Sequence, residues 1–308
     1  MDKIQGRVVE ILLDKYIVKI DNEKYIETIL KGTLKKNKNN VMVGDYVDVE
    51  NAYDKYIITN IVPRKNFLVR PPVSNIDKLL IVISIANPDP DYMLLDKQLI
   101  LCKSKKIKPI LCINKIDLSK DNIKLKETLR YIATTYTDLA YQIIYLSTID
   151  NLGITELKLN LEGATSAFSG NSGVGKSSIT SLIVESDLVQ ELKKIEIGSL
   201  GRKTSRGKHT TKYVKLYNIN ENTYLLDTPG FSSYELSDIN YKELKIYYDD
   251  FNKYKCDYED CNHVNESIDV CGVKKALEHG KIDKGRYERY VYIFNKLKEI
   301  DDRKYKKG

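Results

Sequence analysis

A glycine-rich segment near the middle of the chain has the residue types and spacing that bind phosphate groups. It reads Gly170-Asn171-Ser172-Gly173-Val174-Gly175-Lys176-Ser177-Ser178 and contains the pattern G-x-x-x-x-G-K-[ST]. The glycines allow consecutive backbone N–H groups to turn inward around phosphates, and the helix expected next directs the positive end of its dipole at them. We expect Lys176 to reach the β- and γ-phosphates in catalysis and Ser177 to bind Mg²⁺.

A second motif, Asp227-Thr228-Pro229-Gly230, follows an apolar segment and has the residue types that complete a magnesium site. Asp227 would ligate Mg²⁺ together with Ser177, and the backbone N–H of Gly230 would approach the γ-phosphate. Alone, such a stretch is as often an ordinary turn. The phosphate-binding segment upstream favours the magnesium interpretation.

A third motif, Asn114-Lys115-Ile116-Asp117, points to guanine as the base. The carboxylate of Asp117 can accept from both N1–H and the 2-amino group of guanine, a pair of donors that adenine does not offer. Lys115 can lie along the base, and Asn114 can tie this loop to the phosphate-binding segment. Ser147 and Thr148 form a weaker fourth element, whose backbone N–H groups would meet guanine O6. The alternative for Asn114 to Asp117 alone is a solvated loop.

Four potential metal ligands lie close together near the C-terminus: Cys256, Cys261, His263 and Cys271. Three thiols and one imidazole are the complement of a closed, tetrahedral, structural zinc site with no catalytic vacancy. The alternative is a set of reduced thiols without a metal. The two other cysteines, Cys102 and Cys112, lie in apolar segments and are interpreted as core residues.

The residues around the nucleotide motifs predict strands that alternate with amphipathic helices. We expect strands at 77–85, 107–113, 141–146, 164–168, 212–218 and 222–227, and helices at 91–104, 121–137, 154–160 and 176–184. This alternation predicts a mainly parallel sheet with helices on both faces. The motifs then fall at the ends of strands, where one edge of the sheet can bring them together.

The N-terminal residues predict a small all-β module. Short strands are expected at 6–13, 16–20, 24–30, 46–50 and 56–61, which fits a five-stranded OB-fold barrel, with an SH3-like barrel as the alternative. Pro63 and Arg70-Pro71-Pro72 mark a boundary, because proline cannot continue a strand ladder. We therefore divide the chain into an OB-fold at 1–65, an α/β P-loop domain at 66–238 and a helical zinc-binding module at 239–308.

The composition allows an intracellular, multidomain protein. The formal charge is +7, from 50 Lys and Arg against 43 Asp and Glu, which fits either a polyanionic partner or a well-solvated surface. The charged N-terminus lacks the apolar core of a signal peptide, and the run from Leu79 to Ala86 is too short to span a bilayer. We expect a cytoplasmic monomer that binds no membrane.

The order of the motifs is circularly permuted, since the guanine motifs precede the phosphate-binding segment. With that order and the motif Arg206-Gly207-Lys208-His209-Thr210-Thr211, the chain resembles the bacterial small-ribosomal-subunit biogenesis GTPases over nearly its whole length. The resemblance implies a GTPase that acts late in maturation of the 30S subunit, is stimulated by it and contacts its 16S rRNA. It also implies Thr211 as the ligand of Mg²⁺ and the γ-phosphate, with Thr210 as the alternate.

The residue that positions the attacking water is left open by the sequence. Phe231 stands where Ras-like enzymes place the glutamine that orients this water, and phenylalanine cannot do so. His209 is the candidate substitute, while the alternative is that it contacts rRNA or caps a loop. Two other functions compete with the ribosomal one: a permuted GTPase with a non-ribosomal protein partner, and an RNA-binding module whose nucleotide site is purely regulatory.

Overall fold

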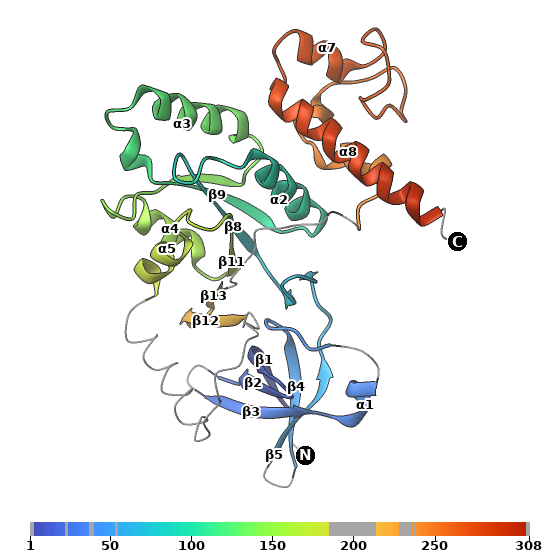
Figure 1. The fold of residues 1–308 in the computed structure, drawn as a ribbon. Helices are drawn as coiled ribbons and strands as arrows, with labels where there is room; N and C mark the ends of the chain where they lie inside the picture. Colours follow the sequence, from blue (N-terminus) through green and yellow to red (C-terminus); the bar gives the residue numbers. More distant parts are fainter. Residues whose placement is uncertain are drawn as a thin grey trace.

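The computed structural model describes residues 3–21, 24–36, 40–52, 55–184, 214–227, 236 and 238–305. Within them a barrel lies at one end, a sheet with helices in the middle, and a helical module at the other end (Figure 1). The predicted site residues His209, Thr210 and Thr211 fall outside the described ranges, as do Gly230 and Phe231. None of the helices in these ranges is long and apolar enough to cross a bilayer.

The N-terminal module is the predicted OB-type barrel. Its strands are β1 (Lys3–Leu12), β2 (Lys15–Lys19), β3 (Tyr25–Leu30), β4 (Tyr46–Ala52) and β5 (Lys55–Ile61), with α1 (Gly32–Lys36) after β3. The strand order β1-β2-β3-β5-β4 is closed by pairing of β1 with β4. The barrel interior is filled by the fully buried side chains of Val8, Val18, Val47, Val49 and Ile58. Closure removes most of the free strand edges.

The predicted boundary segment packs on the barrel rather than acting as a spacer. It forms a small hairpin of β6 (Phe67–Leu68) and β7 (Val73–Ser74). Buried Asp45 accepts hydrogen bonds from Ser74 Oγ at 2.6 Å and from Arg64 Nε at 2.7 Å. Gly44 is required beside it, because its φ is +97° and a Cβ would lie 2.3 Å from the carbonyl oxygen of Ser74.

The central sheet has the strand order β10-β9-β8-β11-β13-β12. Its strands are β8 (Lys78–Ser84), β9 (Lys108–Asn114), β10 (Gln142–Tyr145), β11 (Thr165–Ser169), β12 (Lys215–Asn220) and β13 (Thr223–Asp227). The helices are α2 (Tyr92–Ser104), η1 (Ile116–Ser119), α3 (Ile123–Tyr136), α4 (Ile154–Leu161) and α5 (Lys176–Ile183). The strands are parallel except β12, which runs antiparallel to β13. The predicted parallel sheet is therefore confirmed, and its last strand turns back as a hairpin.

The barrel and the central sheet join edge to edge. Glu10 of β1 pairs with Lys215 of β12, so that the two form one continuous sheet of 11 strands. Buried Arg7 crosses the seam: its Nη2 donates to Thr165 Oγ1 at 2.8 Å, and its guanidinium lies 4.4 Å from the centre of the Tyr224 ring. These contacts fix the barrel against the strand that leads to Asp227.

The C-terminal module is built around aromatic rings. It contains the short 3-10 segments η2 (Tyr241–Tyr247) and η3 (Phe251–Lys253) and the helices α7 (Gly272–Glu278) and α8 (Lys284–Tyr305). Its core includes the fully buried side chains of Tyr248, Phe251 and Tyr290, whose ring centres lie 4.8–5.0 Å apart. Its α8 runs past α2 of the central domain (Figure 1). The predicted helical character is confirmed, although the part before the cysteines forms 3-10 turns.

Candidate nucleotide site and metal centre

The parallel strands bring the described residues of the nucleotide motifs to one edge of the sheet. The glycine-rich segment follows β11, Lys115 follows β9, Ser147 follows β10, and Asp227 ends β13. All four strands run in the same direction, so their carboxyl ends meet at the same edge. This edge is where open α/β sheets bind ligands. The side chain of Asp227 lies outside the described part of the chain.

The glycine-rich segment forms a phosphate-binding loop because three glycines adopt conformations that other residues avoid. The φ angles of Gly170, Gly173 and Gly175 are +136°, +81° and +101°. A Cβ on Gly170 would lie 2.2 Å from the carbonyl oxygen of Val82, and one on Gly175 would lie 2.2 Å from Asn114 Nδ2. The loop therefore packs closely against both β8 and the guanine motif.

The ammonium group of Lys176 lies within the phosphate-binding loop. Lys176 Nζ donates to the carbonyl oxygens of Gly170 at 2.7 Å and Asn171 at 2.6 Å. Lys176 begins α5, so the N–H groups of the first helical turn face the same space. Ser177 and Ser178 are exposed at this helix start. The loop thus presents an ammonium group, a hydroxyl and a helix N-terminus to an anion.

Asn114 and Lys115 tie the guanine motif to the phosphate-binding loop. Asn114 is fully buried and its Nδ2 donates to the carbonyl oxygen of Val174 at 2.8 Å. Lys115 Nζ donates to the carbonyl oxygen of Gly173 at 2.8 Å, and the residue adopts a left-handed φ of +62°. The two loops consequently form one unit, as the sequence analysis expects of Asn114.

The base-recognition residues lie beside this unit. Asp117 is half-buried in η1, with no hydrogen bond from its side chain to any other described residue. Ser147 is fully buried and its Oγ accepts from the backbone N–H of Asp150 at 3.1 Å, which fixes the turn that contains Thr148. The carboxylate of Asp117 is therefore available to a ligand, as guanine recognition requires.

A loop that sequence reasoning missed, Ala86–Asp91, also contacts the site. Lys115 Nζ donates to the carbonyl oxygen of Asn87, and Asn171 Nδ2 donates to Asp91 Oδ2 at 3.1 Å. Asp91 Oδ1 also caps α2 by accepting from Leu94 N at 2.9 Å. The signal that could have revealed this loop is the acid at the start of a helical pattern after a buried strand, which is typical of an N-cap.

The four predicted metal ligands converge in the C-terminal module. Their ligand atoms lie within 4.8 Å of one another. His263 Nδ1 lies 3.5, 3.4 and 3.5 Å from the sulfurs of Cys256, Cys261 and Cys271. A tetrahedron with Zn–S of about 2.3 Å and Zn–N of about 2.0–2.1 Å requires S···N separations of about 3.6 Å. The four residues therefore fit a zinc ion.

The backbone around the cysteines is held by polar side chains. Lys245 Nζ donates to the carbonyl oxygen of Cys261 at 3.0 Å, and Tyr287 Oη donates to that of His263 at 2.6 Å. Glu266 accepts from the N–H groups of Asn262 and Val264 at 2.8 and 3.0 Å. These contacts fix the direction of the ligands, which is how outer groups tune a metal site.

Protonation of the cluster is set mainly by burial. Burial, together with the cations Lys245 and Lys274, lowers the pKa of His263 to about 4, so its imidazole is neutral near pH 7 and can bind a metal. Burial raises the pKa of Cys261 to about 12 and that of Cys271 above its usual value. Zinc would therefore displace thiol protons when it binds. Cys102 and Cys112 are fully buried in the core, as predicted.

The sequence of this chain is similar to known proteins that all carry the same family name. A family model described as RsgA GTPase matches residues 61–237. A small ribosomal subunit biogenesis GTPase RsgA from Ruminiclostridium cellulolyticum is 38% identical over 297 residues, covering 95% of this chain and 93% of that protein. Its counterpart from Caldanaerobacter subterraneus subsp. tengcongensis is 37% identical over 310 residues, covering 99% of this chain and 100% of that protein.

Solved structures show the same similarity in three dimensions. YjeQ from Thermotoga maritima matches with a TM-score of 0.78 and 32% identity over 96% of this chain and 99% of that one. YloQ, described as a circularly permuted GTPase, matches with a TM-score of 0.77 and 29% identity over 97% of this chain and 96% of that one. The similarity therefore covers the barrel, the central domain and the C-terminal module together.

Proposed function

This chain belongs to the RsgA GTPase family, and we propose that it binds the 30S ribosomal subunit and hydrolyses GTP late in the maturation of that subunit. As a member of this family it is a GTP hydrolase that acts in small ribosomal subunit biogenesis. The observation that carries the proposal is the nearly full-length similarity to proteins named for this process. We further propose that the subunit stimulates the hydrolysis.

The proposed GTP site is the edge of the sheet described above. Its residues are Asn114, Lys115, Asp117, Ser147, Thr148, Gly170, Asn171, Ser172, Gly173, Val174, Gly175, Lys176, Ser177, Ser178, Asp227 and Gly230. Asp117 would select guanine, and Lys176 would stabilise charge on the β- and γ-phosphates. Ser177, Asp227 and Thr211 would hold Mg²⁺. When bound, Mg²⁺ would supply positive charge to the phosphates.

The proposed hydrolysis step depends on positioning of water. The side chain of Phe231 has no polar atom with which to orient it, so we assign this role to His209, whose imidazole can hydrogen-bond a water. Thr211 would complete the Mg²⁺ shell next to it. The alternative role of His209, contact with rRNA, predicts a loss of subunit affinity instead of a loss of rate.

The barrel and the C-terminal module are proposed as the parts that face 16S rRNA. We assign the OB-fold to residues 1–65, the GTPase domain to 66–238 and the zinc-binding module to 239–308. The net charge of +7 is compatible with a polyanionic partner, and the fit of the Cys256 cluster to one structural Zn²⁺ supports a rigid module. We propose that the protein acts as a cytoplasmic monomer.

Sedimentation with purified 30S subunits tests this function. The protein should co-sediment with 30S subunits more strongly with a non-hydrolysable GTP analogue than with GDP, and 30S subunits should raise its turnover. A permuted GTPase with a non-ribosomal partner would show neither effect. An RNA-binding module with a regulatory nucleotide site would bind without stimulated turnover. Either result would refute the proposal, and 50S subunits provide the matched control.

A further inference from the structure

Helix α2 contacts the phosphate-binding loop along one face. At its start, Asp91 accepts from Asn171 Nδ2 at 3.1 Å while also capping the helix. Two turns later, Gln98 Nε2 donates to Ser169 Oγ at 2.6 Å, and both side chains are buried. At 3.6 residues per turn, Asp91 and Gln98 lie within about 20° of each other around the helix. Their partners stand on either side of Gly170, so α2 holds the N-terminal end of the loop, where it leaves β11.

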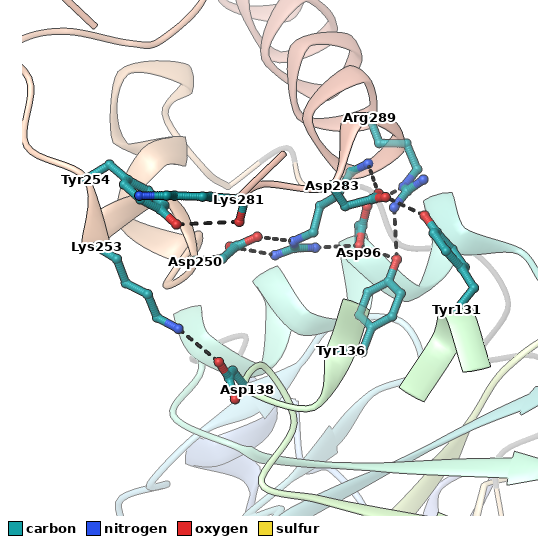
Figure 2. A network of polar contacts seen from close by, with 11 residues as sticks. Asp96, Tyr131, Tyr136, Asp138, Asp250, Lys253, Tyr254, Lys281, Asp283 and Arg289 are labelled. Carbon is teal, nitrogen blue, oxygen red and sulfur yellow. Dashed lines mark hydrogen bonds and ion pairs between the residues drawn. The ribbon is translucent and has the colours of Figure 1, made fainter. Parts of the chain in front are cut away.

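The opposite face of α2 holds the C-terminal module. Asp96 is fully buried, and its carboxylate accepts from Arg286 Nη1 at 2.5 Å, Arg289 Nε at 2.5 Å and Tyr136 Oη at 2.9 Å. Figure 2 shows Arg289 of α8 and Tyr136 of α3 pointing toward Asp96. On a helical wheel, Asp96 lies about 140° from Asp91. The same helix is thus fixed to two parts of the protein on two different faces.

The contact with the module is a cluster of two cations and two anions, of which Asp96 and Arg286 are buried and Arg289 and Asp250 are partly exposed. Arg286 also donates from Nε to Asp250 Oδ2 at 2.6 Å, so two guanidinium groups face the two carboxylates of Asp96 and Asp250. Although burial alone would lower the pKa of Arg286, these carboxylates raise it above its usual value. Such directional, charge-assisted hydrogen bonds favour one relative position of α2 and α8 and are broken when one helix shifts along the other. Asp250 lies between η2 and η3, which precede the first cysteine of the cluster.

We propose that α2 positions the phosphate-binding loop for GTP hydrolysis, and that docking of the C-terminal module on Asp96 keeps α2 in that position. This inference rests on the proposed assignment of that loop as the GTP site. Asp91, Asp96 and Arg289 are positioning residues, since they act on the nucleotide only through Asn171 and Ser169. A partner that moves the C-terminal module would then alter the loop through α2.

A double-mutant cycle on the full-length protein tests the connection. Gln98→Leu removes the buried contact of α2 with Ser169 and keeps most of the side-chain volume, and Arg289→Ala removes one guanidinium from Asp96; both are combined in a third variant. Lys253→Ala is the matched control, because Lys253 Nζ pairs with Asp138 at 3.0 Å and so joins the module to the GTPase domain without touching α2. Steady-state kcat and KM for GTP are measured without ribosomal subunits, and zinc content reports on the module.

Each single variant should lower kcat about 2- to 30-fold, the range of coupling effects for residues that act through neighbours, with KM changed less than kcat. The double variant should lose less than the product of the two single losses, because both changes weaken the same connection. Multiplicative losses, or a parental kcat in Arg289→Ala, would overturn the inference. A loss in Lys253→Ala as large as that in Arg289→Ala would do so too.

A second variant is used if Arg289→Ala does not fold. If Arg289→Ala yields protein without zinc, Arg289→Lys replaces it, because lysine keeps the charge but cannot bond both Asp96 and Tyr136 as arginine does. This kinetic test does not depend on whether the protein binds the 30S subunit, since no subunit is present in the assay. Failure of the nucleotide assignment is detected separately, by unchanged base preference in an Asp117 variant.

Discussion

Replacement of Asp117 by asparagine should exchange guanine for xanthine as the preferred base. The change is nearly isosteric, and the side chain of Asp117 makes no hydrogen bond with any other described residue, so the substitution breaks no hydrogen bond of the described fold. Asn114 and Lys115, which tie the loop to the phosphate-binding loop, are untouched. The variant therefore isolates recognition of the base.

The size of the effect follows from the two hydrogen bonds that guanine would donate to the carboxylate. Asparagine offers one acceptor and one donor, so one bond is weakened to a neutral one and the other becomes a donor facing a donor. Charge-assisted hydrogen bonds contribute about 1.5–3 kcal/mol each. With one bond lost and the other reduced to a neutral bond of about 0.5–1.5 kcal/mol, the total is about 2.5–4.5 kcal/mol, or about 10²- to 10³-fold in affinity. Xanthine presents a C2 carbonyl in place of the amino group and restores the match.

Equilibrium displacement of a fluorescent nucleotide gives the two dissociation constants. Asp121→Asn is the control, since this acid is exposed in the same region of the chain, and it should bind GTP like the parent. Zinc content and thermal unfolding should match the parent in both variants. If Asp117→Asn binds GTP as tightly as the parent and xanthosine triphosphate no better, the assignment of Asp117 is wrong.

Three further changes test other parts of the molecule. Cys261→Ala should abolish zinc in elemental analysis and weaken 30S binding, while nucleotide affinity stays within about threefold, because the metal stabilises its own module. His209→Ala should bind GTP and 30S subunits normally yet lose most of a stimulation that can reach about 10⁵-fold; a full stimulated rate would exclude its role with water. Gly44→Ala should lower the unfolding temperature, since strain at a positive φ costs about 1–3 kcal/mol and a Cβ would meet Ser74 O; unchanged melting would contradict that.

Most of the fold could be predicted because its signals are local. The alternation of apolar strands and helices predicts β8 to β11 with their intervening helices, and the short strands of the N-terminal module predict the barrel. The glycine-rich segment could be placed at the start of α5 because its spacing demands that conformation. The cysteine cluster could be predicted because cysteine and histidine residues close together in sequence indicate a metal site.

The parts that could not be predicted depend on pairs distant in sequence. Asp96 and Arg286 are 190 positions apart, and nothing in the pattern around either residue indicates its partner. A charged residue within a helical pattern is usually on a solvated face, yet Asp96 is fully buried. The pairing of β1 with β12 was missed for the same reason, since the sequence of an edge strand does not indicate which strand will pair with it.

The pairing of β1 with β12 has a consequence for the growing chain. A ribosome makes about 5–20 residues per second, and Thr165, the acceptor for Arg7, follows it by 158 positions. From the completion of β5 at Ile61 to the synthesis of Lys215, 154 positions later and about 8–30 s at that rate, the edge of β1 at Glu10 that faces away from β2 has no partner strand. An uncovered strand edge is a template for strands of other chains. Polypeptides truncated before Lys215 would keep that edge permanently and should aggregate more readily than the finished protein.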